Sequence, residues 1–223
     1  MVKPIVIFGA GGHGREILQI VLDINALAPR WQPMGFLAEP GHETRAEVHG
    51  LPVLGGIDWL IGNPHAQVIV AIGSPAVRRR IAVAIAAQTR NEFANLIHPS
   101  AWLGGNVEIG SGSVLFPGCK VTTDVVLGCH VHLNLDCTLS HNVRIGDFVT
   151  LGPRVTLCGN VDLDEGVEVG ASSVFIPRTR IGAWSVVGAG SVVTRSQPDN
   201  VTVVAAPARI VKTHAAGWQD GSN

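Results

Sequence analysis

The chain has 223 residues, of which 46% are hydrophobic and 15% are charged, and its formal net charge is −1. This composition excludes a disordered chain, which combines low hydrophobicity with high net charge, and it lacks the basic excess of a nucleic-acid-binding protein. No run approaches 18 consecutive apolar residues, so the sequence predicts no membrane span.

Residues 1–98 alternate short apolar strands with helical segments, a pattern that predicts a small domain with a parallel sheet. We expect strands at 5–8, 34–37, 68–72 and 93–97, and helices from just after residue 14 to about 27 and from 75 to 88. The first residues run directly into an apolar strand, and we therefore expect no signal peptide.

The first strand is followed by Gly9-Ala10-Gly11-Gly12-His13-Gly14, which matches the G-x-G-x-x-G fingerprint between a strand and a helix. Glycines let the backbone approach a phosphate, and a helix N-terminus attracts negative charge. A domain of this size holds one nucleotide-binding half rather than the two that NAD spans. The motif therefore favours a mononucleotide or nucleotide-sugar phosphate over NAD, and a purely structural tight turn is the alternative.

A six-residue repeat dominates the second half of the chain. From Leu103 to residue 198 there are 16 consecutive units, whose first residue is Leu, Ile or Val except at Phe175 and whose fifth is Val, Ser, Cys or Thr in 15. The period does not match the 3.6-residue helical repeat. It predicts short strands and tight turns, three units to a triangular coil, with the first and fifth residues pointing inward. We expect a parallel β-helix over 99–198, followed by a C-terminal cap and tail over 199–223.

The order of these parts resembles one enzyme family. A small α/β domain with GAGGHG, a hexapeptide β-helix and a closing Ala206-Pro207-Ala208-Arg209 are similar to the bacterial sugar O- and N-acyltransferases of the sialic-acid O-acetyltransferase and bacillosamine N-acetyltransferase type. The resemblance implies a Rossmann-like nucleotide-binding domain, a left-handed β-helix, acetyl-CoA as cosubstrate, no metal, and a homotrimer with its sites between subunits.

Within this family, the segment 139–146 is most similar to the GDP-perosamine N-acetyltransferases. The resemblance implies transfer of an acetyl group to the 4-amino group of a nucleotide-linked 4-amino-4,6-dideoxy sugar, for lipopolysaccharide O-antigen, other surface polysaccharide or glycoprotein synthesis. O-acetylation of a sialic-acid-type sugar is the enzymatic alternative.

The family's catalytic histidine matches His141, which is third in its hexapeptide and should point out of the β-helix. The resemblance implies that it acts as the general base, a role that suits imidazole near neutral pH. Asn142 stands where the bacillosamine enzymes have an acidic residue that orients the histidine, and we expect its amide to orient His141 by hydrogen bonding. Thr150 replaces a second histidine that contacts the acetyl group, so its hydroxyl is a candidate donor to the thioester oxygen. The alternative for Thr150 is a surface residue on a turn.

The resemblance also implies binding residues for both substrates. Those for the nucleotide sugar are Gly11, Gly12, His13, Glu39, Gly73 and Asn134. Those for acetyl-CoA are Thr150, Gly159, Ala171 and Ala189. For Asn134 the alternative is an asparagine ladder, and for the small residues it is ordinary turn structure. The family's acidic pair after the second strand is Ala38–Glu39 here, which leaves the nucleotide base open. Ser74 and Arg78 lie nearby in the sequence and are left out of the set.

Two hypotheses of other classes remain. His130, His132 and His141 together suggest the zinc site of a γ-type carbonic anhydrase, although that class lacks the GAGGHG domain; the simpler interpretation puts His130 and His132 on an outward strand face. A trimeric scaffold whose α/β domain only senses a nucleotide is the non-enzymatic alternative.

The four cysteines form no CxxC pair, which argues against a zinc knuckle. We expect a cytoplasmic protein with free thiols.

Overall fold

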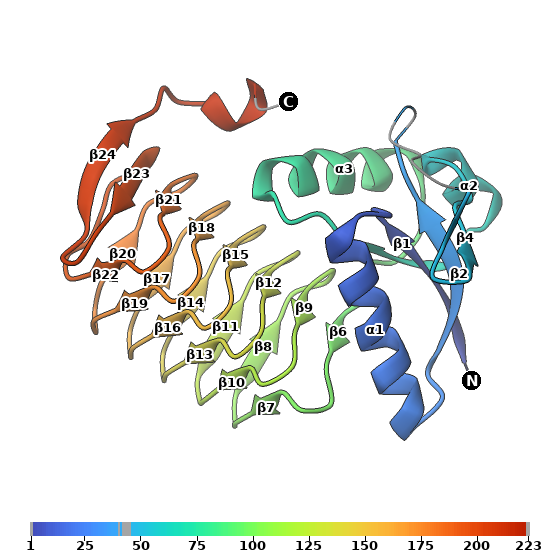
Figure 1. Cartoon of the computed structure of the whole chain (residues 1–223), viewed down its shortest axis with the longest axis horizontal. Coiled ribbons are helices and arrows are strands. Elements are labelled where there is room, and N and C mark those ends of the chain that lie inside the picture. Colours follow the sequence, from blue (N-terminus) through green and yellow to red (C-terminus); the bar gives the residue numbers. More distant parts are fainter. Residues whose placement is uncertain (1, 40, 42–45, 222–223) are drawn as a thin grey trace.

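The computed structural model describes residues 2–39, 41 and 46–221, and it consists of a small α/β domain at one end of a parallel β-helix (Figure 1). The predicted fold class is therefore confirmed. None of the helices in the described residues is both long and apolar enough to cross a bilayer.

The N-terminal domain is built on a three-stranded parallel sheet in the order β2-β1-β5. Its strands are β1 (Lys3–Phe8), β2 (Trp31–Leu37) and β5 (Gln67–Val70), and its helices are α1 (Gly12–Leu27), α2 (Ile57–Gly62) and α3 (Pro75–Gln88). The strands are apolar because both faces of the sheet are covered. One face packs in a cluster with α1 and the first coils of the β-helix, and the other packs with α2 and α3.

Two parts of this domain differ from the sequence expectation. A short hairpin, β3 (Glu47–Val48) with β4 (Leu51–Pro52), and helix α2 were not predicted. Of the expected strand at 93–97, Phe93 alone bridges to Val68 of the small sheet, whereas β6 (Leu96–Ile97) pairs with β9 (Val114–Leu115). The sheet of the β-helix therefore begins before the repeat is recognisable in the sequence.

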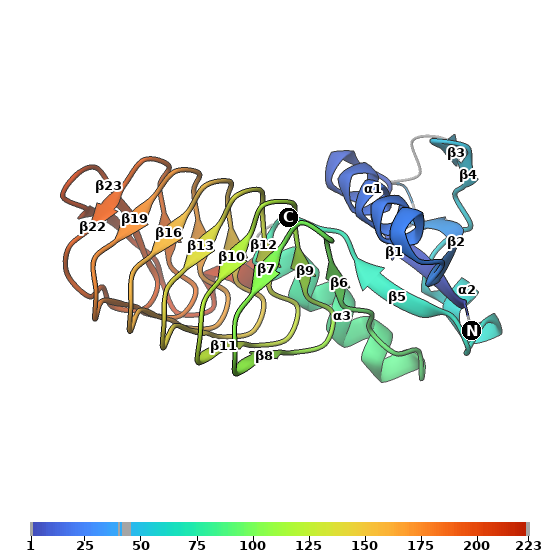
Figure 2. The same cartoon turned by 90° about the horizontal axis from the view of Figure 1, so that it is seen from below.

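The β-helix has three sheets, one for each side of its coils, and their strands are parallel except for β24 at the end of one sheet (Figure 2). The six-stranded sheet contains β7 (Trp102–Leu103), β10 (Lys120–Val121), β13 (Thr138–Leu139), β16 (Thr156–Leu157), β19 (Val174–Phe175) and β22 (Val192–Val193). The five-stranded sheet contains β8 (Val107–Ile109), β11 (Val125–Leu127), β14 (Arg144–Ile145), β17 (Asp162–Leu163) and β20 (Arg180–Ile181). The eight-stranded sheet contains β6, β9, β12 (His132–Leu133), β15 (Thr150–Leu151), β18 (Glu168–Val169), β21 (Val186–Val187), β23 (Val201–Val204) and β24 (Arg209–Thr213).

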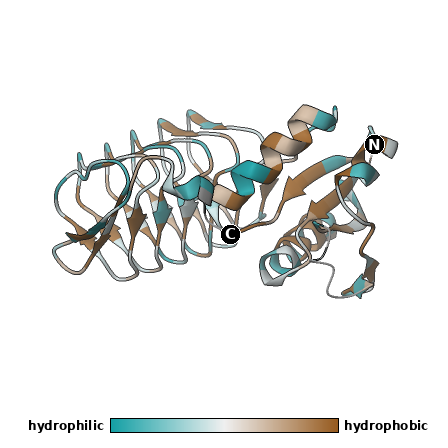
Figure 3. Ribbon diagram, turned by 90° about the horizontal axis from the view of Figure 1, so that it is seen from above, coloured by the Kyte–Doolittle hydropathy of each residue, from teal (hydrophilic) through white to brown (hydrophobic). Residues whose placement is uncertain are grey.

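Residues 18 apart pair from coil to coil, as Lys120 does with Thr138 and Thr138 with Thr156. The first and fifth residues of the repeat are inside, as predicted; Leu151 and Val149 are both 0% exposed. The fourth residue of many units, such as Asn142 or Phe148, has a positive φ and turns the chain. Figure 3 shows the apolar strands of both parts in brown.

The C-terminal segment closes the far end of the β-helix and then returns along it toward α3 (Figure 1). Strand β24 pairs antiparallel with β23, and a short 3-10 helix, η1 (Trp218–Gly221), follows. The Trp218 indole donates to the Trp184 carbonyl at 3.1 Å. Residues 222–223 of the predicted tail lie outside the described residues. All four cysteines are unpaired.

Candidate active site

The carboxyl ends of β1, β2 and β5 meet at one edge of the small sheet. The Gly9 N–H donates to the Leu37 carbonyl and the Ala71 N–H to the Phe8 carbonyl, both at 2.7 Å, so the segments that follow the three strands lie side by side. This edge carries the glycine-rich turn, Glu39 and the start of α3. Ligands of open parallel sheets bind at such carboxyl edges.

The glycines of the turn divide into two groups. A Cβ on Gly14 would lie 1.8 Å from the Gly9 oxygen, so this glycine is needed for close packing of α1 on the strand end. Gly11, Gly12 and Gly73 have no such neighbour: a Cβ on Gly11 or Gly73 meets nothing within 4 Å. Three of the predicted substrate residues therefore face open space. We call the stretch formed by Gly11, Gly12, Gly73 and Ser74 the glycine edge.

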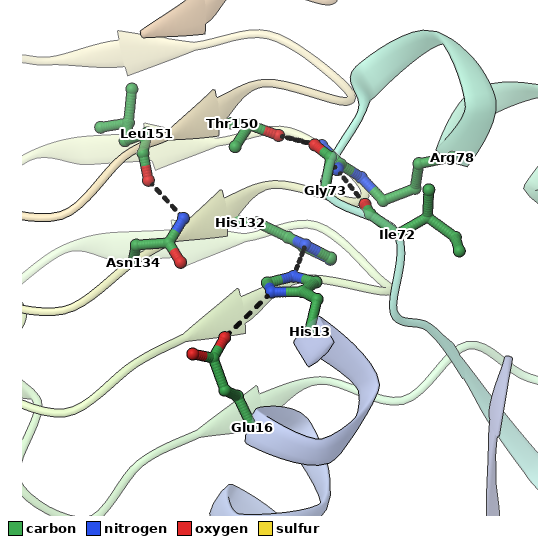
Figure 4. A network of polar contacts seen from close by, with 9 residues as sticks. All are labelled: His13, Glu16, Ile72, Gly73, Arg78, His132, Asn134, Thr150 and Leu151. Atoms are coloured by element: carbon green, nitrogen blue, oxygen red, sulfur yellow. Dashed lines mark hydrogen bonds and ion pairs between the residues drawn. The ribbon is translucent and has the colours of Figure 1, made fainter. Parts of the chain in front are cut away.

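The His13 side chain lies between α1 and the β-helix (Figure 4). Its Nε2 lies 3.0 Å from Nδ1 of His132, its Nδ1 lies 3.5 Å from the Glu16 carboxylate, and its ring stacks on Phe116. The pKa of His13 is lowered, mainly by burial and then by the nearby Arg78 charge. Because both ring nitrogens already have partners, the ring positions α1 on the β-helix, and the predicted contact with phosphate or sugar is left to the backbone N–H of His13.

His132 is fully buried beneath α1, whereas the sequence suggested an outward strand face. Burial and then the Arg78 charge lower its pKa well below the ordinary value, so the ring is neutral. With the His13 Nδ1–H directed to Glu16, the hydrogen bond is completed if His132 Nδ1–H donates to His13 Nε2. The position of His132 in the repeat could have indicated this burial, because it begins a strand in a coil that contacts the N-terminal domain.

Asn134 follows His132 and lies on the same side of the β-helix (Figure 4). Its Nδ2 donates to the Leu151 carbonyl at 2.7 Å, one coil further on. The Asn134 amide therefore forms one coil-to-coil hydrogen bond, as the alternative of an asparagine ladder predicts. Its contact with the sugar stays a prediction.

Glu39 comes after β2 and pairs with Arg80 of α3, whose guanidinium donates to both carboxylate oxygens at 2.5 and 2.8 Å. This bidentate pair raises the pKa of Arg80. The structure thus places Glu39 at the carboxyl edge of the sheet, where the sequence put it, together with a cation that the sequence analysis did not include.

The junction between the two domains is organised around Arg78, which is fully buried. Its guanidinium donates to the carbonyls of Ile72 (2.7 Å), Gly73 (3.0 Å), His130 (3.0 Å), Phe148 (2.7 Å) and Val149 (3.3 Å), and to the Thr150 hydroxyl (2.9 Å). Burial lowers the pKa of Arg78 to about 9, which keeps it charged at neutral pH. A buried cation persists only when its donors are satisfied in this way.

Thr150 belongs to the same network. Its hydroxyl accepts from Arg78 and donates to the Gly73 carbonyl at 2.9 Å, and the residue is 8% exposed. The single O–H is therefore used between the domains. This geometry does not support the expected hydrogen bond to a thioester oxygen, and Thr150 is not the turn residue of the alternative interpretation either. Arg78 and Thr150, with the carbonyls they contact, are referred to below as the junction network.

His141 lies on another edge of the β-helix, in the turn after β13, and is exposed as predicted. Its ring lies against Gly159 of the next coil, where a Cβ would be 2.5 Å from the imidazole Cε1. Asn142 has a positive φ and donates through Nδ2 to the Asn160 side chain at 3.1 Å. The amide of Asn142 is thus engaged in a ladder along the coils.

A carboxylate that the sequence analysis missed lies near His141. The pKa of Asp124 is lowered, first by hydrogen bonds from Asn106 and Thr123 and also by the charge of His141. Asp124 precedes Asn142 by 18 residues, so it stacks one coil below. The 18-residue spacing could have indicated that Asp124 lies next to the His141 turn.

Ala171 and Ala189 occupy equivalent turns of successive coils, after β18 and β21. A Cβ on Gly170 would lie 2.4 Å from the Ala189 backbone nitrogen, which shows how closely these turns stack. They lie on the same edge as Asn134, further along the axis. Within one chain, the predicted residues thus gather at two places: the glycine edge with Asn134 and the Ala171 edge, and the His141–Gly159 edge.

The three imidazoles of the zinc hypothesis do not form one ligand set. His130 and His132 lie at the junction with the first domain, and His141 lies on a different edge. No group of three His, Cys, Asp or Glu side chains suited to a metal ion occurs within residues 2–39, 41 and 46–221.

Comparison with known proteins tests the predicted family. Residues 4–85 match the family model of the PglD N-terminal domain. PerB from Caulobacter crescentus, solved in complex with CoA and GDP-perosamine, superposes with a TM-score of 0.84 at 28% identity over 95% of this chain and 99% of its own. The acetyltransferase domain of PglB from Neisseria gonorrhoeae FA1090 gives 0.82 at 29% identity over 94% and 100%. The chain is an acyltransferase with the fold of these sugar acetyltransferases.

Two further solved structures are related in the same way. WeeI from Acinetobacter baumannii AYE superposes on the acyltransferase with a TM-score of 0.81 at 28% identity, over 93% of this chain and 99% of its own. A histidine-to-asparagine variant of perosamine N-acetyltransferase from Caulobacter crescentus, with CoA and GDP-perosamine, gives 0.85 at 29% identity over 95% and 98%. A search of curated proteins found no match.

The buried histidines make the stability of the acyltransferase depend on pH. Burial, and then the Arg78 charge, lower the pKa of His130 from 6.5 to about 4. Between these values the unfolded chain binds more protons than the folded one, so stability falls as the pH drops from 6.5 toward 4. For His130 the loss amounts to about 3 kcal/mol.

We predict that His130→Asn, whose side chain stays neutral and tolerates the positive φ at this position, flattens this decline in urea unfolding measured from pH 7.5 to 4. Replacing the exposed His65 by Asn is the control and should leave the decline as it is. An equal decline in the His130 variant would show that this imidazole does not set the pH dependence.

Proposed function

We propose that the protein is an acetyl-CoA-dependent N-acetyltransferase that acts on the 4-amino group of a nucleotide-linked 4-amino-4,6-dideoxy sugar, with GDP-perosamine or a close analogue as substrate. The observation that carries the proposal is the pairing of an open glycine edge with an exposed histidine, His141, on a fold similar along 95% of the chain to a protein solved with CoA and GDP-perosamine.

The glycine edge suits the diphosphate of a nucleotide sugar. Neither α1 nor α3 has a side-chain N-cap, so the first N–H groups of both helices are left for a ligand. Gly11 and Gly12 start α1, and Ser74 precedes α3. Two helix N-termini that point at one edge favour an anion there. Glu39 and its partner Arg80 lie at the same edge, where we place the nucleotide base.

The edges that carry Gly159, Ala171 and Ala189 suit the pantetheine of acetyl-CoA. Turns with small residues let a narrow chain lie close to the backbone, and the family resemblance assigns these positions to the coenzyme. Acetyl-CoA would supply the thioester, whose carbonyl carbon is the electrophile and whose thiolate is the leaving group.

His141 performs the proton transfer in this proposal. The sugar amine attacks the thioester carbonyl while the imidazole takes one N–H proton. Collapse of the tetrahedral intermediate breaks the C–S bond, and the imidazolium returns the proton to the departing CoA thiolate. A thiol is a good leaving group, with an ordinary pKa of about 8.5, so one base near neutrality is sufficient and no metal is required.

The imidazolium that forms during this step needs a negative charge nearby. The amide of Asn142 cannot provide one, and in the structure it bonds to Asn160. Asp124 carries a carboxylate whose charge interacts with His141 from the coil below. We assign charge compensation to Asp124, and to Asn142 the turn that presents His141.

The acceptor and the base lie on different edges of one β-helix, so the proposal needs a second copy of the chain. We place His141 of one protomer opposite the glycine edge and Asn134 of its neighbour, in a homotrimer with three such sites. The reaction would take place in the cytoplasm and serve surface polysaccharide, such as O-antigen, or glycoprotein synthesis.

The experiment that tests this function is acetyl transfer by the purified protein to GDP-, UDP- and dTDP-linked 4-amino-4,6-dideoxy sugars, followed by release of CoA thiol and by product mass. One of these sugars should be acetylated, and His141→Ala should lower kcat by about 10²-fold or more while circular dichroism is unchanged. Transfer to none of them, or a fully active His141 variant, would contradict the proposal.

Gly159 gives a second test with a matched control. Gly159→Ala puts a methyl group into the space of the His141 ring, so we expect a large loss of kcat in a folded protein. Gly105→Ala is the control, because Gly105 is also third in its hexapeptide and precedes an Asn-Val pair, and its Cβ meets nothing within 4 Å. Equal activity of the two variants would mean that the position of the His141 ring does not matter.

A further inference from the structure

The segment between β5 and α3 is shaped by groups that lie behind it. The carbonyls of Ile72 and Gly73 both accept from Arg78, and the Gly73 carbonyl also accepts from Thr150. These donors are buried at the junction between the domains, whereas Gly73 and Ser74 are exposed. The two carbonyls are therefore turned inward, away from the glycine edge (Figure 4).

The direction of a carbonyl fixes the direction of the next N–H. In a trans peptide the C=O of one residue and the N–H of the following residue point opposite ways in one plane, and the peptide bonds here are trans. With the Ile72 and Gly73 carbonyls turned toward Arg78, the N–H groups of Gly73 and Ser74 are turned outward. Neither N–H has a hydrogen-bond partner within the described part of the chain.

We propose that Arg78 and Thr150 are positioning residues for the nucleotide sugar: they hold two peptide planes so that the N–H groups of Gly73 and Ser74 are presented to the diphosphate. The inference rests on the proposed function and extends it. It moves Thr150 from the acetyl-CoA side of the reaction, where the family resemblance put it, to the acceptor side.

Several features of the network support a positioning role beyond simple packing. Arg78 reaches six oxygen acceptors from two domains, and Thr150 is the one side chain among them. The Thr150 hydroxyl joins Arg78 directly to the Gly73 carbonyl, at 2.9 Å on either side. Without this hydroxyl, the Gly73 carbonyl keeps one donor instead of two, and its peptide plane gains freedom to rotate. In the wild type this peptide is ordered before the ligand binds. In a variant without the hydroxyl, the ligand has to order it, and binding is weaker.

The test uses Thr150→Val, which keeps the shape of the side chain and removes the hydroxyl, beside Thr150→Ser, which keeps the hydroxyl. Removal of Arg78 is avoided because it leaves the carbonyls of Ile72, His130 and Phe148 without a donor and risks unfolding. Dissociation constants are measured by calorimetry for GDP, UDP, dTDP and acetyl-CoA with the wild type and both variants, and the thermal midpoint of each protein is recorded.

We expect Thr150→Val to weaken the nucleotide that the wild type binds by about three- to tenfold, the equivalent of one net hydrogen bond. Acetyl-CoA affinity should be unchanged, and Thr150→Ser should restore most of the nucleotide affinity. A lower thermal midpoint with unchanged nucleotide affinity would reduce the network to a structural one and overturn the inference. If Thr150→Val weakened only the binding of acetyl-CoA, Thr150 would belong to the acetyl-CoA site, and the inference would be overturned as well.

These outcomes are separable from failure of the proposed function. If the wild type binds none of the three nucleotides, the nucleotide-sugar proposal itself is contradicted. If the wild type binds one and Thr150→Val binds it equally well, the proposed function stands and the positioning role falls.

Discussion

The arrangement of this protein depends on the burial of one guanidinium. Arg78 comes from α3, yet most of its hydrogen bonds reach the β-helix, so its charge is stabilised only when the two domains meet in one orientation. A buried cation that lost these acceptors would cost several kcal/mol. This constraint fixes the carboxyl edge of a small sheet against one side of a long, rigid coil.

As a consequence, the candidate site residues lie on two different edges of the β-helix. The glycine edge is tied to the side of the β-helix that carries His132, Asn134 and Thr150, whereas His141 projects from the turn after β13. Because coils repeat every 18 residues, two positions 9 apart, such as His141 and Thr150, lie on different sides of the same coil. Under the proposed function, the two edges form one site only where separate copies of the chain pack together.

The periodic parts of the fold could be predicted closely from the sequence, because each position in the repeat has a single environment. Val149 and Leu151 are inside, His141 is outside, and α3 spans the predicted residues. The contacts between domains could not. Arg78 lies among three consecutive arginines, and only the tertiary structure distinguishes the buried one from its exposed neighbour Arg80. For the same reason, the burial of Thr150 could not be predicted from the sequence.

In the proposed reaction, one protomer presents the acceptor and another supplies His141. This arrangement is tested most directly by complementation between two inactive variants, His141→Ala and Gly11→Trp, the latter filling open space at the glycine edge. The two chains are co-expressed with different tags and the mixed oligomers purified. Mixed oligomers should regain a substantial part of wild-type acetyl transfer, because some sites then combine an intact glycine edge with an intact His141. Mixed oligomers as inactive as either parent would contradict this arrangement.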